Sequence, residues 1–167
     1  MSDKVSIKAH SGIYTLRTQQ ELPLSISQAW DFFSNPKNLE AITPDHMGFK
    51  ITSEEPGRCY SGQIISYNIR PLPFFKSSWV TEITFINAPH SFIDEQRFGP
   101  YSMWHHEHMF EETANGVLIT DKVSYKIPLG PLGKLANALF VRNQLIKIFE
   151  YRYKKLEMLF PMPSLTH

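Results

Sequence analysis

The chain alternates between apolar and polar residues over much of its length, which is the pattern of β-strands with one buried face. Glycine, proline and asparagine separate these stretches and predict turns between them. The expected strands cover 13–24, 49–51, 65–69, 79–85, 91–98, 102–111 and 117–127. The Asn115-Gly116 pair predicts a tight hairpin between the last two. The pattern indicates an antiparallel sheet of about seven strands.

Two regions have a helical pattern instead. After the first strand, Ser27 is expected to cap a short helix, and Asn35-Pro36 to begin a second one that stops before Pro44. Residues 134–160 contain neither proline nor glycine and predict one helix of about 40 Å. Such a helix covers one face of a sheet, and a curved sheet that grips a helix commonly leaves a cavity between them.

The pattern therefore predicts one α+β domain with two short helices after its first strand and a long helix at its end. We expect this domain over residues 13–160, followed by a C-terminal tail at 161–167. Residues 1–12 are expected to be a flexible tail, or a frayed first strand up to about Gly12.

The expected strand 102–111 carries the main candidate chemistry. Because side chains alternate along a strand, Trp104, His106, His108 and Phe110 share one face, and His105 lies on the other. Two imidazoles between large aromatic residues must find partners, bind a ligand or bear a cost of desolvation. This face is therefore the most informative feature of the sequence.

The neighbouring strand supplies an acidic partner for these histidines. Counting back from the hairpin at Asn115-Gly116 places Asp121 beside His108 or Phe110, within cross-strand reach. Tyr125 is then expected near His106 or Trp104. Asp94, Gln96 and Arg152 are candidates to join from an adjacent strand and from the covering helix.

Three interpretations of this cluster stay open. The two histidines, Asp121 and Arg152 form a buried hydrogen-bonded network that fixes the sheet against the helix. Alternatively, the same groups line a cavity and contact the polar head of an apolar ligand. In the third interpretation, an imidazole with a carboxylate partner transfers a proton in aldol-type or ring-closing chemistry, so that His106, His108 and Asp121 are the catalytic candidates.

Composition narrows the class of protein. The chain has 167 residues, 42% of them hydrophobic, and a net charge of +1. These values suit a globular domain with one core and argue against nucleic-acid binding. One cysteine, Cys59, excludes an internal disulfide, and no activating partner for its thiol is evident. A polar N-terminus and the lack of a long apolar run predict a cytoplasmic protein without stable membrane insertion.

The order of elements and several local motifs resemble the START-like or Bet v 1-like superfamily, also called SRPBCC, which has the helix-grip fold. The resemblance is closest to small bacterial members of the polyketide cyclase/dehydrase-like or CoxG-like branch. It covers about residues 14–160. The matching positions are Leu24 to Phe33, Pro36, Leu39, Trp79, Phe92, Asp94, Gln96, Gly99-Pro100, Trp104, His106, His108, Phe110, Asp121, Tyr125, Pro128-Leu129-Gly130, Phe149 and Tyr151-Arg152.

The resemblance implies binding of a hydrophobic small molecule, such as a lipid, a polyketide or a quinone, between the sheet and the last helix. The residues expected at such a site are Tyr67, Trp79, Phe85, Gln96, Trp104, His106, His108, Asp121, Tyr125, Phe149 and Arg152. One alternative is a cyclase- or aromatase-like enzyme that uses the histidines with Asp121. Another is a quinone-chaperone or cofactor-assembly protein that contacts a partner or a membrane. The protein is expected to be a monomer or a homodimer.

Two further features bear on these alternatives. The apolar loop that contains Phe74 and Phe75 is expected to fold over the cavity mouth, or to act as a gate that transiently contacts a membrane. The spacing of His106 and His108 also suits a metal, but no convincing third ligand stands out, although Asp121 or Glu95 would serve. We therefore expect neither a metal nor another cofactor.

Overall fold

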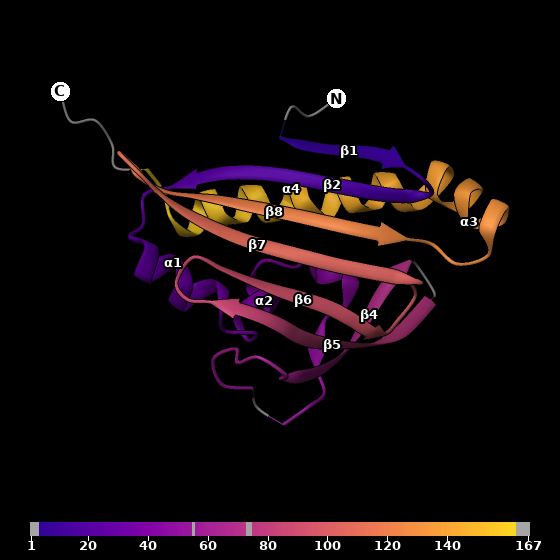
Figure 1. The fold of residues 1–167 in the computed structure, drawn as a ribbon, viewed down its shortest axis with the longest axis horizontal. Coiled ribbons are helices and arrows are strands. Elements are labelled where there is room, and N and C mark those ends of the chain that lie inside the picture. The colour runs from indigo at the N-terminus through magenta and orange to yellow at the C-terminus, as the bar shows by residue number, and fades with distance from the viewer. Residues whose placement is uncertain (1–3, 55, 73–74, 163–167) are drawn as a thin grey trace.

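The structure is a computed structural model that describes residues 4–54, 56–72 and 75–162. Its centre is an eight-stranded antiparallel sheet with the strand order β1-β2-β8-β7-β6-β5-β4-β3 (Figure 1). The strands are β1 (Val5–His10), β2 (Ile13–Leu22), β3 (Lys50–Ile51), β4 (Ile64–Leu72), β5 (Phe75–Asn87), β6 (Ser91–Phe98), β7 (Met103–Thr113) and β8 (Gly116–Lys126). The α+β helix-grip architecture expected from the sequence is confirmed, with one strand more than expected.

The additional strand comes from the N-terminal region. The sequence pattern placed residues up to 12 in a tail or a frayed strand, but β1 pairs with β2 from Val5 opposite Thr18 to His10 opposite Ile13. Val5 is buried and belongs to the same apolar cluster as Leu16. The backbone hydrogen bonds between β1 and β2 therefore add Val5–His10 to the sheet as an edge strand.

The short helices follow β2 as expected, but the first begins earlier in the chain. Helix α1 (Ile26–Phe33) is capped by Ser25 and not by Ser27. The Ser25 side chain accepts a hydrogen bond from the Gln28 backbone N–H, and the Gln28 side chain accepts one from the Ser25 backbone N–H. This reciprocal capping box satisfies two backbone donors, and it explains why Ser25 and not Ser27 caps the helix. Helix α2 (Asn38–Ala41) and the short helix η1 (Asp45–Met47) follow.

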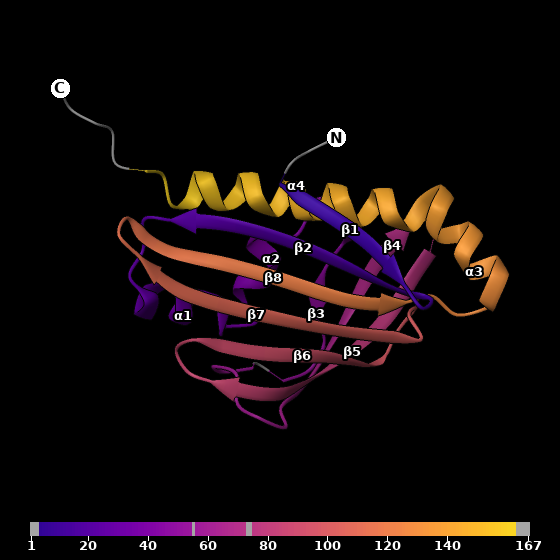
Figure 2. The same cartoon turned by 45° about the horizontal axis from the view of Figure 1, so that its top comes forward.

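The C-terminal helix runs along the sheet (Figures 1 and 2). It begins as α3 (Gly130–Ala136), passes through the π-helical turn η2 (Asn137–Val141) and continues as α4 (Arg142–Leu159). It buries Leu145, Phe149 and Leu156. Helices α1 and α2 lie toward the C-terminal end of α4 (Figure 2), where the Phe32 and Phe160 rings meet edge to face, 5.1 Å between centroids.

The apolar core has two parts, with polar residues between them. One cluster contains Phe110 and Ile119, and the other contains Val123 and Tyr125. Along β8, Asp121 lies between these clusters, two residues from Ile119 on one side and from Val123 on the other. The fold therefore places a band of polar side chains across the middle of the surface that faces α4.

Candidate functional site

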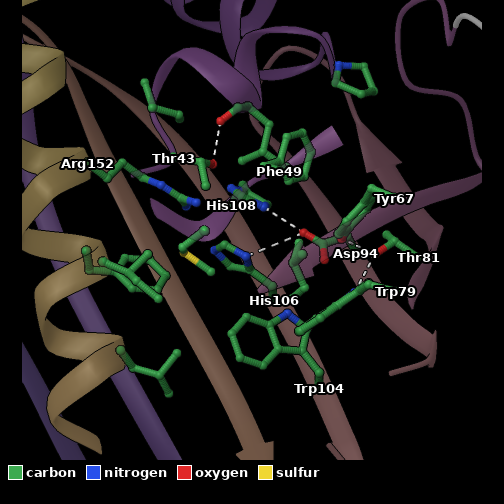
Figure 3. Close-up of a pocket in the computed structure, with 18 of the residues that line it drawn as sticks. Thr43, Phe49, Tyr67, Trp79, Thr81, Asp94, Trp104, His106, His108 and Arg152 are labelled. Atoms are coloured by element: carbon green, nitrogen blue, oxygen red, sulfur yellow. Dashed lines mark hydrogen bonds and ion pairs between the residues drawn. The ribbon is translucent and has the colours of Figure 1, made fainter. Parts of the chain in front are cut away.

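A cavity of about 260 Å³ lies between the sheet and α4. Its wall is largely apolar and is formed by side chains from the sheet and from α4, among them Ile69, Trp79, Ile83, Leu145, Ile148 and Phe149. Asp94, His106, His108 and Arg152 also border it, and Figure 3 shows these four side chains close together in one group, which we call the polar end of the cavity. The cavity thus combines an apolar body with one polar end, the general form of a small-molecule site.

Two histidines and two aspartates form the centre of this polar end. His106 and His108 lie on one face of β7, with Asp94 of β6 opposite His106 and Asp121 of β8 opposite His108. His106 Nε2 is 2.9 Å from Asp121 Oδ1, and His108 Nε2 is 2.9 Å from Asp94 Oδ2. The centroids of the two imidazole rings lie 3.7 Å apart, and their planes are tilted by 34°. The expected shared face of the histidines and the proximity of Asp121 are both present.

The second nitrogen of each imidazole also lies near a carboxylate. His106 Nδ1 is 3.5 Å from Asp94 Oδ2, and His108 Nδ1 is 3.0 Å from Asp121 Oδ1. The latter contact lacks the direction of a hydrogen bond, so this buried nitrogen has no hydrogen-bond partner among the described residues. Each ring therefore has one nitrogen beside Asp94 and the other beside Asp121.

The environment moves the pKa values of these four groups in different directions. Burial raises the pKa of both carboxyls, but the hydrogen bonds and charges of the histidines outweigh it and lower the pKa of Asp94 and, much further, that of Asp121. Burial and the charge of His108 lower the pKa of His106. Burial also opposes charge on His108, but the adjacent Asp121 and Asp94 outweigh it and raise its pKa. The aspartates are ionised at neutral pH, and His108 is the more readily protonated imidazole.

Arg152 brings a cation to the same end of the cavity from α4 (Figure 3). Its guanidinium carbon lies 4.8 Å from the centre of the Phe149 ring, and its buried Nε has no hydrogen-bond partner within the described chain. Arg152 forms no ion pair with a carboxylate of the described residues, although its charge contributes to the lowered pKa of Asp94. The cation is therefore available to a group inside the cavity.

The part of the cavity wall formed by Tyr67, Trp79 and Trp104 is aromatic, and hydrogen bonds hold two of these rings. Trp79 Nε1 donates to Thr81 Oγ1 at 3.0 Å, and the Tyr67 hydroxyl is 2.7 Å from the same oxygen. Burial, followed by the charge of Asp94, raises the pKa of Tyr67, so its hydroxyl stays protonated. Trp79 also meets Trp104 edge to face at 5.1 Å between centroids. These contacts hold the rings in place, which favours a preformed cavity wall.

Most residues expected at the ligand site border the cavity, but four do not. The residues that border it are Tyr67, Trp79, Trp104, His106, His108, Phe149 and Arg152. Asp121 lies behind the histidines and contacts them directly. Tyr125 is fully buried in the core, where its hydroxyl donates to Asn137 Oδ1 at 3.1 Å. Asp121 therefore supports the histidines from behind, and Tyr125 is part of the core. Neither residue belongs to the cavity wall.

Phe85 and Gln96 are the other two expected site residues that do not border the cavity. The β5–β6 pairing shifts register between Ile83 and Phe85, so Phe85 no longer shares a face with Trp79 and is 48% exposed. Gln96 donates through its amide to the Tyr101 carbonyl at 2.7 Å and accepts from the Tyr101 N–H at 3.2 Å. It therefore fixes the turn between β6 and β7. Phe74, expected as part of a gate, lies outside the described residues, as does the side chain of Phe75.

Some wall residues were not expected from the sequence. Tyr101, Phe49 and Leu145 border the cavity. The only sequence signal for Tyr101 is an aromatic residue directly after a Gly-Pro turn, where polar residues are usual. Cys59 also borders the cavity, and burial, followed by the charge of Asp94, raises the pKa of its thiol to about 12. A thiolate nucleophile at this position is therefore disfavoured.

Comparison with known proteins supports the fold. No protein-family model and no curated protein matches the sequence. Among solved structures, protein Ms6760 from Mycobacterium smegmatis is 17% identical with a TM-score of 0.65, and the match covers 93% of this chain and 96% of that one. Ginseng major latex-like protein 151 from Panax ginseng is 11% identical with a TM-score of 0.63, covering 90% and 99%. Ara h 8.0201 is 13% identical with a TM-score of 0.60, covering 89% and 97%.

These structures include a Bet v 1 allergen and a major latex-like protein, so the chain has the Bet v 1-like, or SRPBCC, fold that its sequence resembles. At these levels of identity the likeness concerns the fold and leaves the function to be argued from the site. Within the described residues, none of the helices has the length and apolar character needed to cross a membrane.

Proposed function

We propose that this protein binds a small, mostly apolar molecule whose anionic or strongly hydrogen-bond-accepting end faces Arg152 and His108. The observation that carries this proposal is the Arg152 cation, which has no ion-pair partner in the described part of the chain and which α4 places at the polar end of an apolar cavity. Arg152 is half-buried and its buried Nε has no hydrogen-bond partner among the described residues. A ligand carboxylate, enolate or phenolate would pair with its guanidinium through charge-assisted hydrogen bonds. The aromatic wall around Trp79 and Trp104 would hold the apolar part.

The size of the cavity narrows the class of ligand. Ligand pockets in proteins usually measure roughly 300 to 1,000 Å³, and this cavity, at about 260 Å³, is slightly smaller than that range. It favours a compact ring system or a short chain over a full-length membrane lipid. Among the expected ligand classes, a short polyketide or a single-ring quinone fits better than a long-chain lipid.

Octanoate is expected to bind at least about tenfold more tightly than 1-octanol, because a charge-assisted hydrogen bond contributes about 1.5 to 3 kcal/mol. Binding can be followed by tryptophan fluorescence, since Trp79 and Trp104 border the cavity. In Arg152→Gln the preference for octanoate should disappear while octanol binding persists. Lys147→Gln, an exposed position on the same helix, is the matched control and should keep the preference. Lack of saturable binding of either molecule would contradict the proposal.

Proton transfer is the second candidate function, and a specific arrangement favours it. His106 and His108 both border the cavity, and each is held by a carboxylate at 2.9 Å. An imidazole oriented in this way can act as general base or general acid on a bound carbonyl compound. This is the cyclase-like alternative, and it uses the same cavity.

A poly-β-keto thioester tests this alternative. We expect ring closure to fall by about 100-fold or more in His106→Ala or His108→Ala if the imidazoles transfer the proton. His105→Ala should leave the rate unchanged, because His105 lies on the other face of β7 and contacts Glu95. Cyclised product must be measured by mass spectrometry against the uncatalysed reaction. Equal rates in all variants and in buffer would remove the catalytic hypothesis and leave the binding function.

The partner- or membrane-contacting alternative rests on Phe74 and Phe75 and stays a prediction, as do a cytoplasmic location and a monomeric or homodimeric state.

A further inference from the structure

We propose that Asp94, His106 and His108 bind a divalent transition-metal ion at the polar end of the cavity. Each of the three residues offers one ligand atom, and these atoms all lie within 4.8 Å of one another. Asp94 Oδ2 is 2.9 Å from His108 Nε2 and 3.5 Å from His106 Nδ1. Ligand atoms that surround one ion at the usual bond lengths stand about 3 to 3.5 Å apart. Small side-chain adjustments would therefore suffice to place one ion among all three.

The opposite side of the two imidazoles supports this assignment. A histidine that binds a metal through one nitrogen usually donates its other N–H to a carboxylate. Asp121 holds this position for His106, whose Nε2 is hydrogen-bonded to Asp121 Oδ1 at 2.9 Å. The same oxygen lies 3.0 Å from His108 Nδ1 without the direction of a hydrogen bond, so a small rotation of the His108 ring would be needed to give it the same support. The sequence offered Asp121 or Glu95 as a third ligand, and the structure points to Asp94 instead.

The site would be open toward the cavity. Asp94, His106 and His108 border the main cavity, whereas Asp121 does not. Three protein ligands on one side leave the remaining coordination positions for water or for a bound molecule. Two imidazoles and one carboxylate suit zinc, iron(II) or cobalt(II) better than calcium or magnesium, which prefer oxygen ligands.

Charge also favours a cation at this position. Two carboxylates, the buried Asp121 and the partly buried Asp94, stand in a largely apolar interior beside two imidazoles. Separating two negative charges from water is unfavourable unless positive charge lies nearby. A divalent ion would balance both carboxylates with both imidazoles neutral, and would leave Arg152 available to a ligand. This inference does not depend on the identity of the apolar ligand, or on there being one.

Cobalt(II) titration of tag-free, chelator-treated protein tests the proposal. We expect one cobalt ion per chain after gel filtration, visible absorption of a cobalt–imidazole complex, and a higher Tm with either cobalt or zinc. Asp121→Asn should weaken cobalt binding by about 10- to 100-fold, and Asp94→Asn or His106→Ala should weaken it further. Wild-type protein that takes up no cobalt and shows no change in Tm would overturn the proposal, whatever the variants do.

His105→Ala separates this site from adventitious binding at the surface. His105 lies on the outer face of the same strand, with its Nδ1 2.7 Å from Glu95 Oε1. If this variant loses the cobalt signal while Asp94→Asn keeps it, the ion belongs to the outer face and the proposal is wrong. Octanoate binding measured with the chelator present tests the cavity independently, so a failure of the metal site is distinguishable from a failure of the proposed binding function.

Discussion

Replacing Asp121 with alanine should lower the free energy of unfolding by about 3 to 5 kcal/mol, the range observed when one partner of a buried ion pair is removed. The side chain is 5% exposed and contacts both His106 and His108. Its loss would leave the Nε2–H of His106 without an acceptor and His108 with one carboxylate in place of two. Chemical denaturation near neutral pH, with chelator present to exclude metal, measures the change.

Two further variants test whether the loss of stability in Asp121→Ala comes from the burial of this carboxylate. Asp31→Ala removes an exposed carboxylate that pairs with Arg58 at 2.9 Å, and its effect should stay within about 1 kcal/mol. Asp121→Asn keeps the shape and one acceptor but loses the charge, so it should fall between wild type and Asp121→Ala. A loss below about 0.5 kcal/mol in Asp121→Ala would mean that this side chain faces solvent, contrary to the structure.

Phe110→Ala should lower the free energy of unfolding by a similar amount, about 3 to 5 kcal/mol. Phe110 is 1% exposed, and its ring meets Trp30, Phe33 and Phe92 within 6.2 Å between centroids. Truncation would leave a void among rings that α1 holds against the sheet, and neighbouring rings fill such a void incompletely. Thermal and chemical denaturation should agree on the loss.

The same substitution at an exposed position is the matched control. Phe98 is 74% exposed near the end of β6, so Phe98→Ala should change stability by no more than about 0.5 kcal/mol. Phe110→Ala has a further expected effect, because Phe92 stacks both on Phe110 and, at 4.1 Å, on His108. Weaker octanoate binding in Phe110→Ala than in Phe98→Ala would show that this aromatic contact positions the polar end. Equal stability of the two variants would contradict the packing described here.

The local pattern of apolar and polar residues in the sequence was sufficient to predict most of the fold. Alternation along β7 predicted the common face of His106 and His108, because a strand has only two faces. The Asn115-Gly116 turn predicted that Asp121 lies beside His108 or Phe110, because a tight hairpin restricts which residues pair across it, and the structure places it opposite His108. Pro161 likewise predicted the C-terminal end of the long helix, which stops at Leu159. The expected start at residue 134 was wrong: the helix begins at Gly130, because its first turn tolerates proline.

Other features depended on interactions that no local pattern encodes. The bulge in β5 turns Phe85 outward, and a single inserted residue of this kind leaves the apolar pattern before it unchanged. The position of Asp94 depends on how β6 aligns with β7 across a Gly-Pro turn, for which several loop lengths are compatible with the same sequence. Tyr125 has the alternation of a cavity residue, yet packing against Tyr14 and a bond to Asn137 place it in the core.

The sequence by itself therefore determined the strands from β2 onward, most of the long helix and the meeting of two histidines with Asp121, because these follow from the periods of strand and helix and from one short turn. The tertiary structure decided which side of the histidines is open. It placed Asp94 and Arg152 on the cavity side and Asp121 behind, because the distance between a helix and a sheet depends on packing contacts between residues far apart in the chain. Because of this arrangement, the polar side chains between the two core clusters border a cavity and form a candidate site for a ligand and a metal ion.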